Sequence, residues 1–467
     1  MLSVGHNFSS MRARAVEIVR RLKAAGHKAY FVGGCVRDQL LGQEPQDYDI
    51  ATSARPEQIE SLFPHTIPVG RKFGVVLVIE QGKQFQAATF RAEADYRDGR
   101  HPGRITFCDA MADARRRDFT VNGLFFDPIE DRLHDWVGGE LDLRSRIIRT
   151  IGNPYQRFAE DHLRLLRAVR FAAQLNFRIE AKTFAGLRAA AREILNVSAE
   201  RIREELLKLF RPPHAARGLH LVRESGLLPQ ILPEIAATVE CEQSPEFHPE
   251  GSVFNHLIRI LEHLPAEASP SLIWAALLHD IGKPVTASRD PHTRQIHFYG
   301  HENVGAEIAR GMLERLRFPR KLIEEVAVCV QSHMQFKDVL RMRKSTLRRM
   351  LLRPTFALEL ELHRLDCLGS HGRLDHYEFL VEQAAQLERQ PAIRPPLLSG
   401  KDLLALGMKP GPAVGRLLAE VREKQLQDEL KTRPQARAWA RRHLQREGAT
   451  PGRELSASKS GRQKKKT

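Results

Sequence analysis

Two patterns of hydrophobic and polar residues divide the chain. Between residues 28 and 140, short apolar runs alternate with Gly-rich or charged turns, which predicts strands at AYFV, DYDIAT, GVVLVIE, FQAATF and NGLFFD. From about residue 155 onward, apolar residues recur every three to four positions, as at Leu165, Val169 and Ala172, which predicts helices. The predicted fold is therefore multi-domain, with an N-terminal α/β head and a mainly α-helical remainder.

Pro-rich and low-complexity stretches indicate where the helical part divides. Breaks are predicted at FRPPHAAR and RQPAIRPPL, and after Gly448, where the sequence becomes polar and too low in complexity to pack. The predicted domains are a head at 1–140, a helical neck at 141–212, a third domain at 213–392, a helical tail at 393–447 and a disordered basic end at 448–467.

Charge and composition narrow the class of protein. The formal net charge of +16 favours a polyanionic partner, with nucleic acid ahead of an acidic membrane surface. Residues 449–467 hold six Lys or Arg against Glu454, so this end accounts for +5 and the rest keeps +11. No run approaches the ~18 apolar residues of a membrane helix, the first residues do not resemble a signal peptide, and the five cysteines form no CxxC pair. We expect a cytoplasmic protein that binds no membrane.

The stretch FVGGCVRDQLLGQEPQDYDIATS combines features of a nucleoside triphosphate site. Two aspartates at i and i+2 on a strand project from one face, so Asp47 and Asp49 can converge on a Mg²⁺ ion, the cation that bridges phosphates in phosphoryl transfer. Gly33 and Gly34 let the backbone approach a triphosphate, and Arg37 adds a fixed positive charge. Each feature alone is more often an ordinary turn, but together they favour a nucleotidyltransferase.

Six motifs then carry a family resemblance. They are GGCVRDQLLG, DYDIATSARPEQI, GRKFGVV, ATFRAEADYRDGRHP, RRRDFTVNGLFFDP and RFAEDHLRLLRAVRFAAQLNF. In order and spacing they resemble the bacterial CCA-adding enzyme and poly(A) polymerase family of template-independent RNA nucleotidyltransferases, over about residues 25 to 215. The resemblance implies that Asp47 and Asp49 hold the catalytic metals and activate the RNA 3′-hydroxyl. It also implies that the triphosphate is contacted by Gly33, Gly34 and Arg37.

The run RRRD is expected to contact the ribose of the nucleotide. The resemblance implies that Arg117 and Asp118 bind the nucleotide, and that Asp118 contacts the ribose 2′-hydroxyl and so selects ribonucleotides. From the residues alone, a solvated basic helix end is the alternative interpretation.

One position departs from the family pattern. Members commonly carry an acidic residue where this chain has Gln86, and that acid is a candidate third catalytic carboxylate. Glutamine cannot supply the charge, although its carbonyl oxygen can accept a hydrogen bond or coordinate weakly. Either Asp47 and Asp49 alone supply the catalytic carboxylates, or the activity is reduced.

The segment EDHLR offers an account of base choice. Asp161 and Arg164 are expected at i and i+3 on one helix face. A carboxylate accepts from an exocyclic amino group and a guanidinium donates to a ring nitrogen or carbonyl, so the pair can read the Watson–Crick edge of C or A. The alternative is an ordinary surface ion pair. Arg167 and Arg170 extend this basic helix and are expected to steer nucleotide or RNA phosphates.

Residues 254 to 371 carry the motifs FNHL, AALLHDIGKP, HFYGHENVG, QSHMQ and HRLDCLGSH. A lone histidine on an apolar helix is usually a core residue, but imidazole and carboxylate groups in this order suit a divalent metal that activates water. They resemble the HD phosphohydrolase domain, whose metal is of unknown identity here. The resemblance implies His256, His279, Asp280 and Asp366 as ligands, with His301 and His333 at a second metal.

The preferred function is addition of CMP and AMP, as CCA, to the 3′ end of tRNA from CTP and ATP with Mg²⁺, together with an HD phosphohydrolase activity. The runner-up function is addition of A alone, either to tRNA ending in CC or as a poly(A) polymerase. The motif VGRKFG resembles a feature of some poly(A) polymerases. The loop EADYRDGRHPGR instead resembles the one that A addition requires in this family, which argues against an enzyme that adds only C. A phosphohydrolase with a silent head and a non-catalytic RNA-binding protein remain as other classes. The segment LLSGKDLLALGMKPGPAVGRLLAEVREKQL resembles the family's RNA-binding tail, with a plain helix–turn–helix as the alternative.

Overall fold

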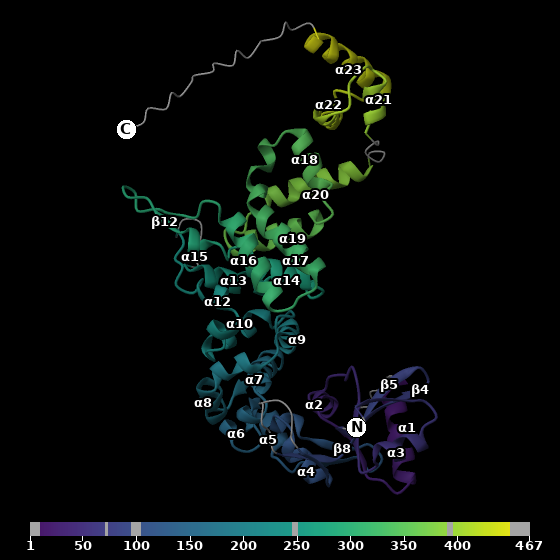
Figure 1. The fold of residues 1–467 in the computed structure, drawn as a ribbon. Coiled ribbons are helices and arrows are strands. Elements are labelled where there is room, and N and C mark those ends of the chain that lie inside the picture. The colour runs from purple at the N-terminus through teal and green to yellow at the C-terminus, as the bar shows by residue number, and fades with distance from the viewer. Residues whose placement is uncertain (1–9, 71–72, 95–103, 245–250, 390–395, 449–467) are drawn as a thin grey trace, which may run out of the picture. The chain divides into compact units, whose positions relative to one another are not determined.

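The computed structural model describes residues 10–70, 73–94, 104–244, 251–389 and 396–448 (Figure 1). The chain forms two compact units. The first comprises residues up to 334 with 361–373, and the second comprises 335–360 with the residues from 374 on. Within the described residues, no helix has the length and apolar character needed to cross a membrane. The loop EADYRDGRHPGR and the basic C-terminal end lie largely or wholly outside the described residues.

A seven-stranded mixed sheet forms the centre of the head, in the order β3-β4-β5-β2-β1-β8-β9. Its strands are β1 (Ala29–Val32), β2 (Asp49–Thr52), β3 (Thr66–Gly70), β4 (Val75–Glu80), β5 (Lys83–Thr89), β8 (Phe125–Asp127) and β9 (Arg132–His134). Neighbouring strands are antiparallel except β2 and β5, which are parallel. The five predicted strands are confirmed. Strand β3 was missed because it contains Pro68, which is tolerated here since β3 is an edge strand.

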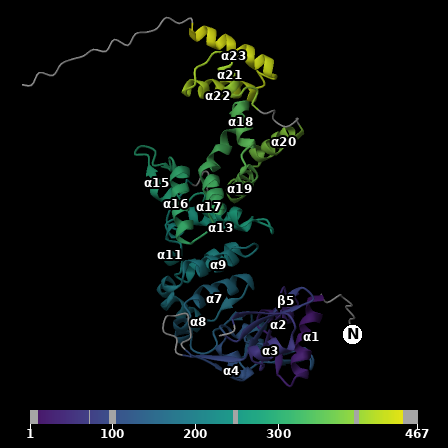
Figure 2. The same cartoon turned by 45° about the vertical axis from the view of Figure 1, so that its right-hand side comes forward.

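Helices cover the sheet (Figure 2). They are α1 (Ser10–Ala24), α2 (Gly34–Leu40), α3 (Pro56–Leu62), α4 (Ala110–Arg116) and α5 (Gly139–Ser145), and the hairpin β6 (Arg91–Ala94) with β7 (Arg104–Phe107) lies against α4. The central strand β1 is apolar on both faces, so Phe31 and Val32 are both buried although they point in opposite directions. This places the end of β1, and the glycines after it, on a rigid support.

The remainder of the first unit is mainly helical, as predicted. Its longer helices are α6 (Pro154–Glu160), α7 (Leu163–Gln174), α8 (Ala181–Ala189), α9 (Ala199–Leu209), α10 (Ala215–Glu224), α13 (Val253–Glu262), α14 (Pro270–Leu278), α16 (His301–Arg315), α17 (Arg320–Ser332) and most of α19 (Phe356–Gly369). Helix α7 packs on α9 and α10 through the predicted stripe of Leu165, Val169 and Ala172, all fully buried.

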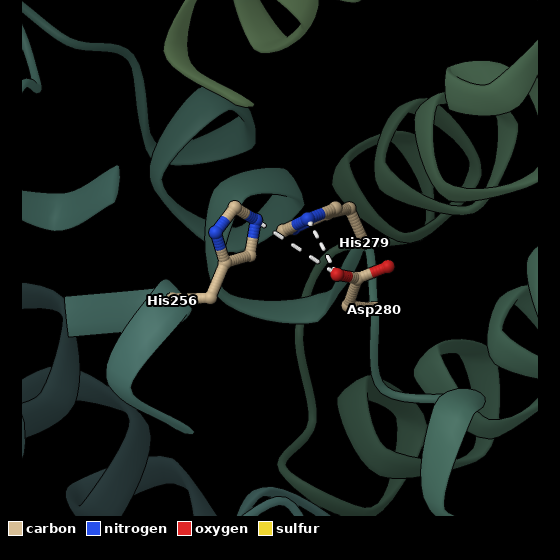
Figure 3. A group of neighbouring side chains, drawn as sticks. All are labelled: His256, His279 and Asp280. Atoms are coloured by element: carbon tan, nitrogen blue, oxygen red, sulfur yellow. Dashed lines mark ion pairs between the residues drawn. The ribbon is translucent and has the colours of Figure 1, made fainter. Parts of the chain in front are cut away.

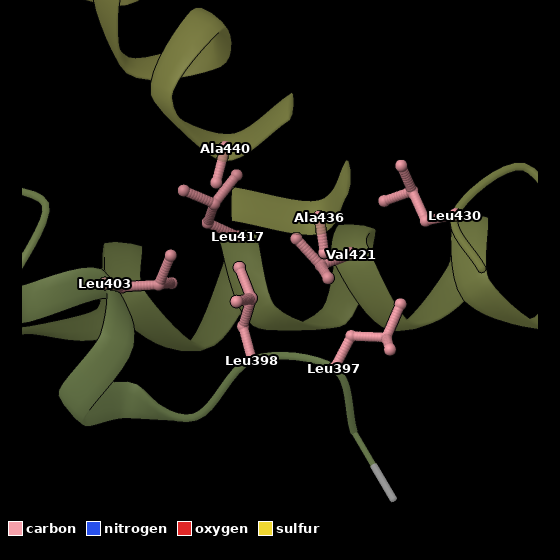
Figure 4. Packing of buried hydrophobic residues seen from close by; sticks show 8 residues of the cluster. All are labelled: Leu397, Leu398, Leu403, Leu417, Val421, Leu430, Ala436 and Ala440. Carbon is pink, nitrogen blue, oxygen red and sulfur yellow. The ribbon is translucent and has the colours of Figure 1, made fainter. Parts of the chain in front are cut away.

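The second unit is also helical. It contains α18 (Lys344–Leu351), α20 (Asp375–Arg389), α21 (Gly400–Leu404), α22 (Pro412–Leu426) and α23 (Arg433–Gly448). Figure 4 shows one apolar cluster between the last three helices, in which Leu403, Leu417 and Val421 meet Ala436 and Ala440. The tail is therefore a small packed helical body with a core of its own.

Candidate active sites

The two predicted catalytic carboxylates lie at the start of β2. Only Asp49 is in the strand; Asp47 precedes it, which corrects the expectation that both are strand residues. The buried Tyr48 lies between the partly buried Asp49 and the exposed Asp47, so the two aspartates keep one side of the chain. Burial, and after it the charge of Asp47, raises the pKa of Asp49 to about 6, while Arg117 acts in the opposite direction. Two carboxylates and a guanidinium thus share one small region.

The glycines follow strand β1. Val32 pairs with Asp49 across the ladder, so Gly33 begins next to that carboxylate. Gly33 has φ 73°, a conformation that favours glycine, and a Cβ there would lie 3.2 Å from Nη1 of Arg117 and would crowd that guanidinium. Arg37, on α2, donates to Oδ1 of Asn122 at 2.7 Å, which holds its guanidinium at the same end of the sheet.

The RRRD run is ordered by a buried acid. Helix α4 ends at Arg116, and both Arg116 and Arg117 form ion pairs with Asp113, whose side chain is 1% exposed. Arg117 is itself mostly buried, so it is not part of a solvated helix end. Sequence reasoning missed Asp113, although its place three residues before Arg116 and four before Arg117 was a usable signal.

Asp118 faces the neck. Its carboxylate accepts from Nε of Arg167 at 2.9 Å and from Nδ2 of Asn122 at 3.2 Å. Burial opposes ionisation of Asp118, but the Arg167 guanidinium outweighs it and holds the pKa well below its usual range. The carboxylate is therefore charged and oriented at neutral pH.

Three of the predicted arginines gather around one phenylalanine that sequence reasoning missed. The guanidinium carbons of Arg37, Arg167 and Arg170 lie 5.3, 5.2 and 3.9 Å from the ring centroid of Phe171. Arg170 is also buried and paired with Glu205, which joins α7 to α9 rather than facing solvent. Phe171 thus connects an arginine of the head with two of the neck.

The EDHLR segment departs from the single-helix expectation. Helix α6 ends at Glu160, Asp161 is extended with φ −142°, and α7 begins at Leu163, so Asp161 and Arg164 do not share a helix. Asp161 accepts from Nη2 of Arg201 at 3.2 Å. Arg164 is buried and donates to Glu160 at 2.7 Å and to a backbone carbonyl of α6. Each side chain is therefore held by partners of its own.

Gln86 lies beside the catalytic strand. Ile50 of β2 and Ala87 of β5 are paired in parallel, so the residues before them, Asp49 and Gln86, are neighbours on adjacent strands. Gln86 is exposed. The glutamine that replaces the family's usual acidic residue therefore lies next to the aspartates.

The six residues predicted to bind metal in the third domain converge, although they come from α13, the turn after α14, the start of α16, the end of α17 and the body of α19. The carboxylate of Asp280 stands between two pairs of histidines: Oδ2 faces Nε2 of His279 at 3.2 Å and of His256 at 3.8 Å (Figure 3), and Oδ1 faces Nε2 of His301 at 3.4 Å and of His333 at 3.6 Å. Oδ1 of Asp366 completes the set, 3.0 Å from Nε2 of His256.

The imidazoles are oriented for a cation. In His279, His301 and His333, Nδ1 lies 3.0, 2.7 and 2.6 Å from the carbonyl oxygen three residues earlier. A carbonyl only accepts, so each Nδ1 carries the hydrogen and each Nε2 presents a lone pair. Two such atoms, in His301 and His333, face each other at 3.2 Å, and Nε2 of His279 is buried without a hydrogen bond. Facing lone pairs beside a carboxylate fit a bound cation, so the residues present suit a divalent metal.

Sequence reasoning also missed Lys283. This buried lysine donates to Oδ2 of Asp280 at 2.7 Å and to Oε1 of Gln243 at 2.6 Å. Its place three residues after Asp280 was a signal for the first contact, whereas nothing in the sequence indicated Gln243.

The chain is a nucleotidyltransferase with an HD domain, and domains of both kinds generally use divalent metals. Family models match the Poly A polymerase head domain over residues 29–149, the probable RNA- and SrmB-binding site of polymerase A over 176–238, and the HD domain over 252–354.

Named relatives support the same class of protein. The chain is 35% identical to the A-adding tRNA nucleotidyltransferase of Deinococcus radiodurans, covering 91% of this chain and 96% of that one. It is 33% identical to the CCA-adding enzyme of Enterococcus faecalis, covering 88% and 90%. The match to a CCA-adding enzyme of Geobacillus sp. is 43% identical but spans about half of that enzyme, 53%. The crystal structure of the Bacillus stearothermophilus CCA-adding enzyme with CTP superimposes with a TM-score of 0.71 at 28% identity, covering 95% and 100%. The chain belongs to the family of CCA-adding enzymes and tRNA nucleotidyltransferases.

Proposed function

We propose that the head adds CMP and AMP to the 3′ end of tRNA from CTP and ATP, building the sequence CCA. The observation that carries the proposal is the convergence of Asp47, Asp49, Gly33 and Arg117 at one end of the sheet. The similarity over nearly the whole chain to enzymes that bear these names supports the choice of tRNA as substrate.

Each head residue has a distinct task in this proposal. Asp47 and Asp49 would hold Mg²⁺, which supplies charge neutralisation to the triphosphate when bound. Arg37 and Arg117 bind phosphate oxygens beside the glycine turn, where the backbone of Gly33 leaves room. The RNA 3′-hydroxyl attacks the α-phosphorus, a new P–O bond forms, the bond to the β-phosphate breaks, and pyrophosphate leaves.

Ribose and base are selected where the head meets the neck. Asp118 accepts a hydrogen bond from the ribose 2′-hydroxyl with an oxygen that Arg167 has already oriented. Asp161 accepts from the exocyclic amino group of C or A, and Arg164 donates to the ring. Arg201 and Glu160 fix these two side chains in advance, which lowers the cost of ordering them when a nucleotide binds.

The HD domain is proposed to hydrolyse phosphoesters. Its four histidines, Asp280 and Asp366 would hold one or two divalent cations, which supply Lewis-acid activation when bound. Water adds to phosphorus, the ester P–O bond breaks, and the leaving oxygen takes a proton to become an alcohol. Lys283 fixes the orientation of the Asp280 carboxylate. We expect the His279→Ala, Asp280→Ala double variant to lose divalent-dependent phosphoester hydrolysis. A wild-type chain that binds no metal in this domain would exclude the proposed hydrolase activity.

Addition of A alone is the second candidate. The relative from Deinococcus radiodurans, named an A-adding enzyme, matches 91% of this chain. In that case Asp161 and Arg164 act as an adenine selector.

An extension assay separates the two. Purified chain with Mg²⁺ receives tRNA lacking CCA, tRNA lacking only the final A, or an unrelated RNA, each with CTP and ATP together and one of the two labelled. We expect three nucleotides on the first tRNA, one on the second, and no extension in an Asp47→Ala control. Addition of A only would select the second candidate, and wild-type chain inactive on every RNA would leave a phosphohydrolase with a silent head.

A further inference from the structure

An exposed aromatic pair lies next to the HD site. The short hairpin of β12 (Ser288–Arg289) and β13 (Ile296–His297) leads into α16, and the rings of His297 and Tyr299 stack there with centroids 5.2 Å apart and 16° between planes. Tyr299 is 79% exposed, more than any other large apolar or aromatic side chain among the described residues. The imidazole lies beside one face of the ring, and most of the side chain faces solvent.

The residue between them fixes this pair to the metal-binding residues. The carbonyl of Phe298 accepts from Nδ1 of His301 at 2.7 Å. The ring of Phe298 lies 5.5 Å from Nζ of Lys283, which donates to Asp280. The segment thus alternates, with Phe298 turned toward the site and its two neighbours stacked outside.

Chain geometry sets the reach of the pair. Tyr299 stands two residues before His301, so their Cα atoms are at most about 7 Å apart. A nucleotide joins a flat base to its phosphate over a similar span. The backbone that carries Tyr299 therefore lies within a nucleotide's length of the His301 imidazole, so a tyrosine ring turned toward the site can meet the base of a bound phosphoester.

We propose that His297 and Tyr299 form a stacking platform for the base of the HD substrate. The substrate class is then a nucleoside that carries a phosphoester, either as a free nucleotide or as the 3′ end of an RNA. This inference rests on the proposed HD hydrolase activity, and it adds the part of the site that distinguishes nucleosides from other phosphoesters. An aromatic ring with one solvent-facing side accepts any base, because every base has a π-face.

Kinetics with base-bearing and base-free substrates test the platform. The full-length chain, loaded with Mn²⁺, Co²⁺, Ni²⁺ or Zn²⁺, receives adenosine 2′-, 3′- or 5′-monophosphate, an oligoribonucleotide with a 3′-phosphate, or glycerol phosphate. In Tyr299→Ala we expect KM for base-bearing substrates to rise about tenfold, since stacking contributes roughly 1–3 kcal/mol per base. Tyr299→Phe keeps the wild-type KM, kcat changes little, and glycerol phosphate is hydrolysed as before. Tyr155→Ala, at an exposed tyrosine of the neck, is the matched control.

A binding measurement separates the platform from the hydrolase. In Tyr299→Trp, the new indole fluorescence should be quenched by adenosine monophosphate or the oligoribonucleotide and unaffected by glycerol phosphate. Quenching by the oligoribonucleotide alone identifies the RNA end as the ligand. Quenching without hydrolysis of any phosphoester retains the platform and removes the hydrolase. Hydrolysis with an unchanged KM in Tyr299→Ala overturns the platform and leaves the hydrolase, and absence of both signals overturns both.

Discussion

Asp49 is a residue placed for function at a cost in stability. Its folded-state pKa of about 6 lies above the ordinary 3.8, so between these values the folded chain holds a proton that the unfolded chain has lost. Stability therefore falls as pH rises through this interval, and the deficit persists above it. We expect metal-free Asp49→Asn at pH 8 to be more stable than metal-free wild type by on the order of 2 kcal/mol.

Thermal or urea unfolding in EDTA measures this difference. It should vanish at pH 4, where the wild-type carboxyl is protonated in the folded state, and Mg²⁺ should stabilise wild type more than the variant. A variant no more stable than wild type at pH 8 would show that burial of Asp49 is not a destabilising feature.

Gln86 offers a second test at a single residue. It is exposed and lies next to Asp49 on the adjacent strand, so Gln86→Glu adds a carboxylate at the site without filling space in the core. We expect the Mg²⁺ concentration for half-maximal extension to fall several-fold. The control is Gln84→Glu, an exposed glutamine two residues earlier on β5. An equal effect at both positions would mean that only overall charge matters.

Helix α7 joins the head to the neck. Its Phe171 contacts Arg37 and Arg167, while Arg167 and Asn122 both bond to Asp118 and Asn122 bonds to Arg37. These contacts close a ring between the proposed triphosphate and ribose contacts.

We expect Phe171→Leu to raise KM for CTP and ATP by about 3- to 30-fold, since each cation–π contact contributes roughly 0.5–2 kcal/mol. Discrimination against 2′-deoxy-CTP should fall as well, because Asp118 loses its fixed partner. Phe171→Tyr should retain both properties. The control is Phe210→Leu, at a buried phenylalanine that packs on Trp274, which reports the effect of losing apolar contacts in the core. An equal rise in KM and an equal loss of discrimination in this control would mean that Phe171 contributes only to stability.

Element periodicity was predictable, but the break at Asp161 was not. Strand alternation and the stripe of Leu165 and Val169 give strong local signals. The extended conformation at Asp161 depends on its pairing with Arg201 from α9, a contact 40 residues away. A partner so distant in sequence leaves no local pattern.

For the whole molecule, the two sites share no residue. Asp49 begins β2 and Asp47 lies two residues before it, whereas the groups proposed to bind metal come from α13, from the turn after α14 and from later helices. We expect Asp47→Ala to abolish RNA extension while leaving phosphoester hydrolysis intact, and Asp280→Asn to do the reverse.

Parallel assays on the same preparations measure both activities, with circular dichroism to verify folding. Asn preserves the shape of Asp280, so the histidines keep their surroundings while the bridging charge is lost. Loss of both activities in a folded Asp47→Ala variant would contradict independent sites.

The sequence by itself determined the class of fold and five strands of the head, and it singled out the aspartate pair and the histidines proposed to bind metal, because these depend on local periodicity and on side-chain chemistry at short spacing. Tertiary structure decided which groups meet. Asp280 lies between histidines that precede it in the sequence and histidines that follow it. Asp118 pairs with Arg167, 49 residues later, and three guanidiniums contact Phe171. Such pairings arise when helices pack, and packing is set by the whole apolar surface rather than by neighbouring residues.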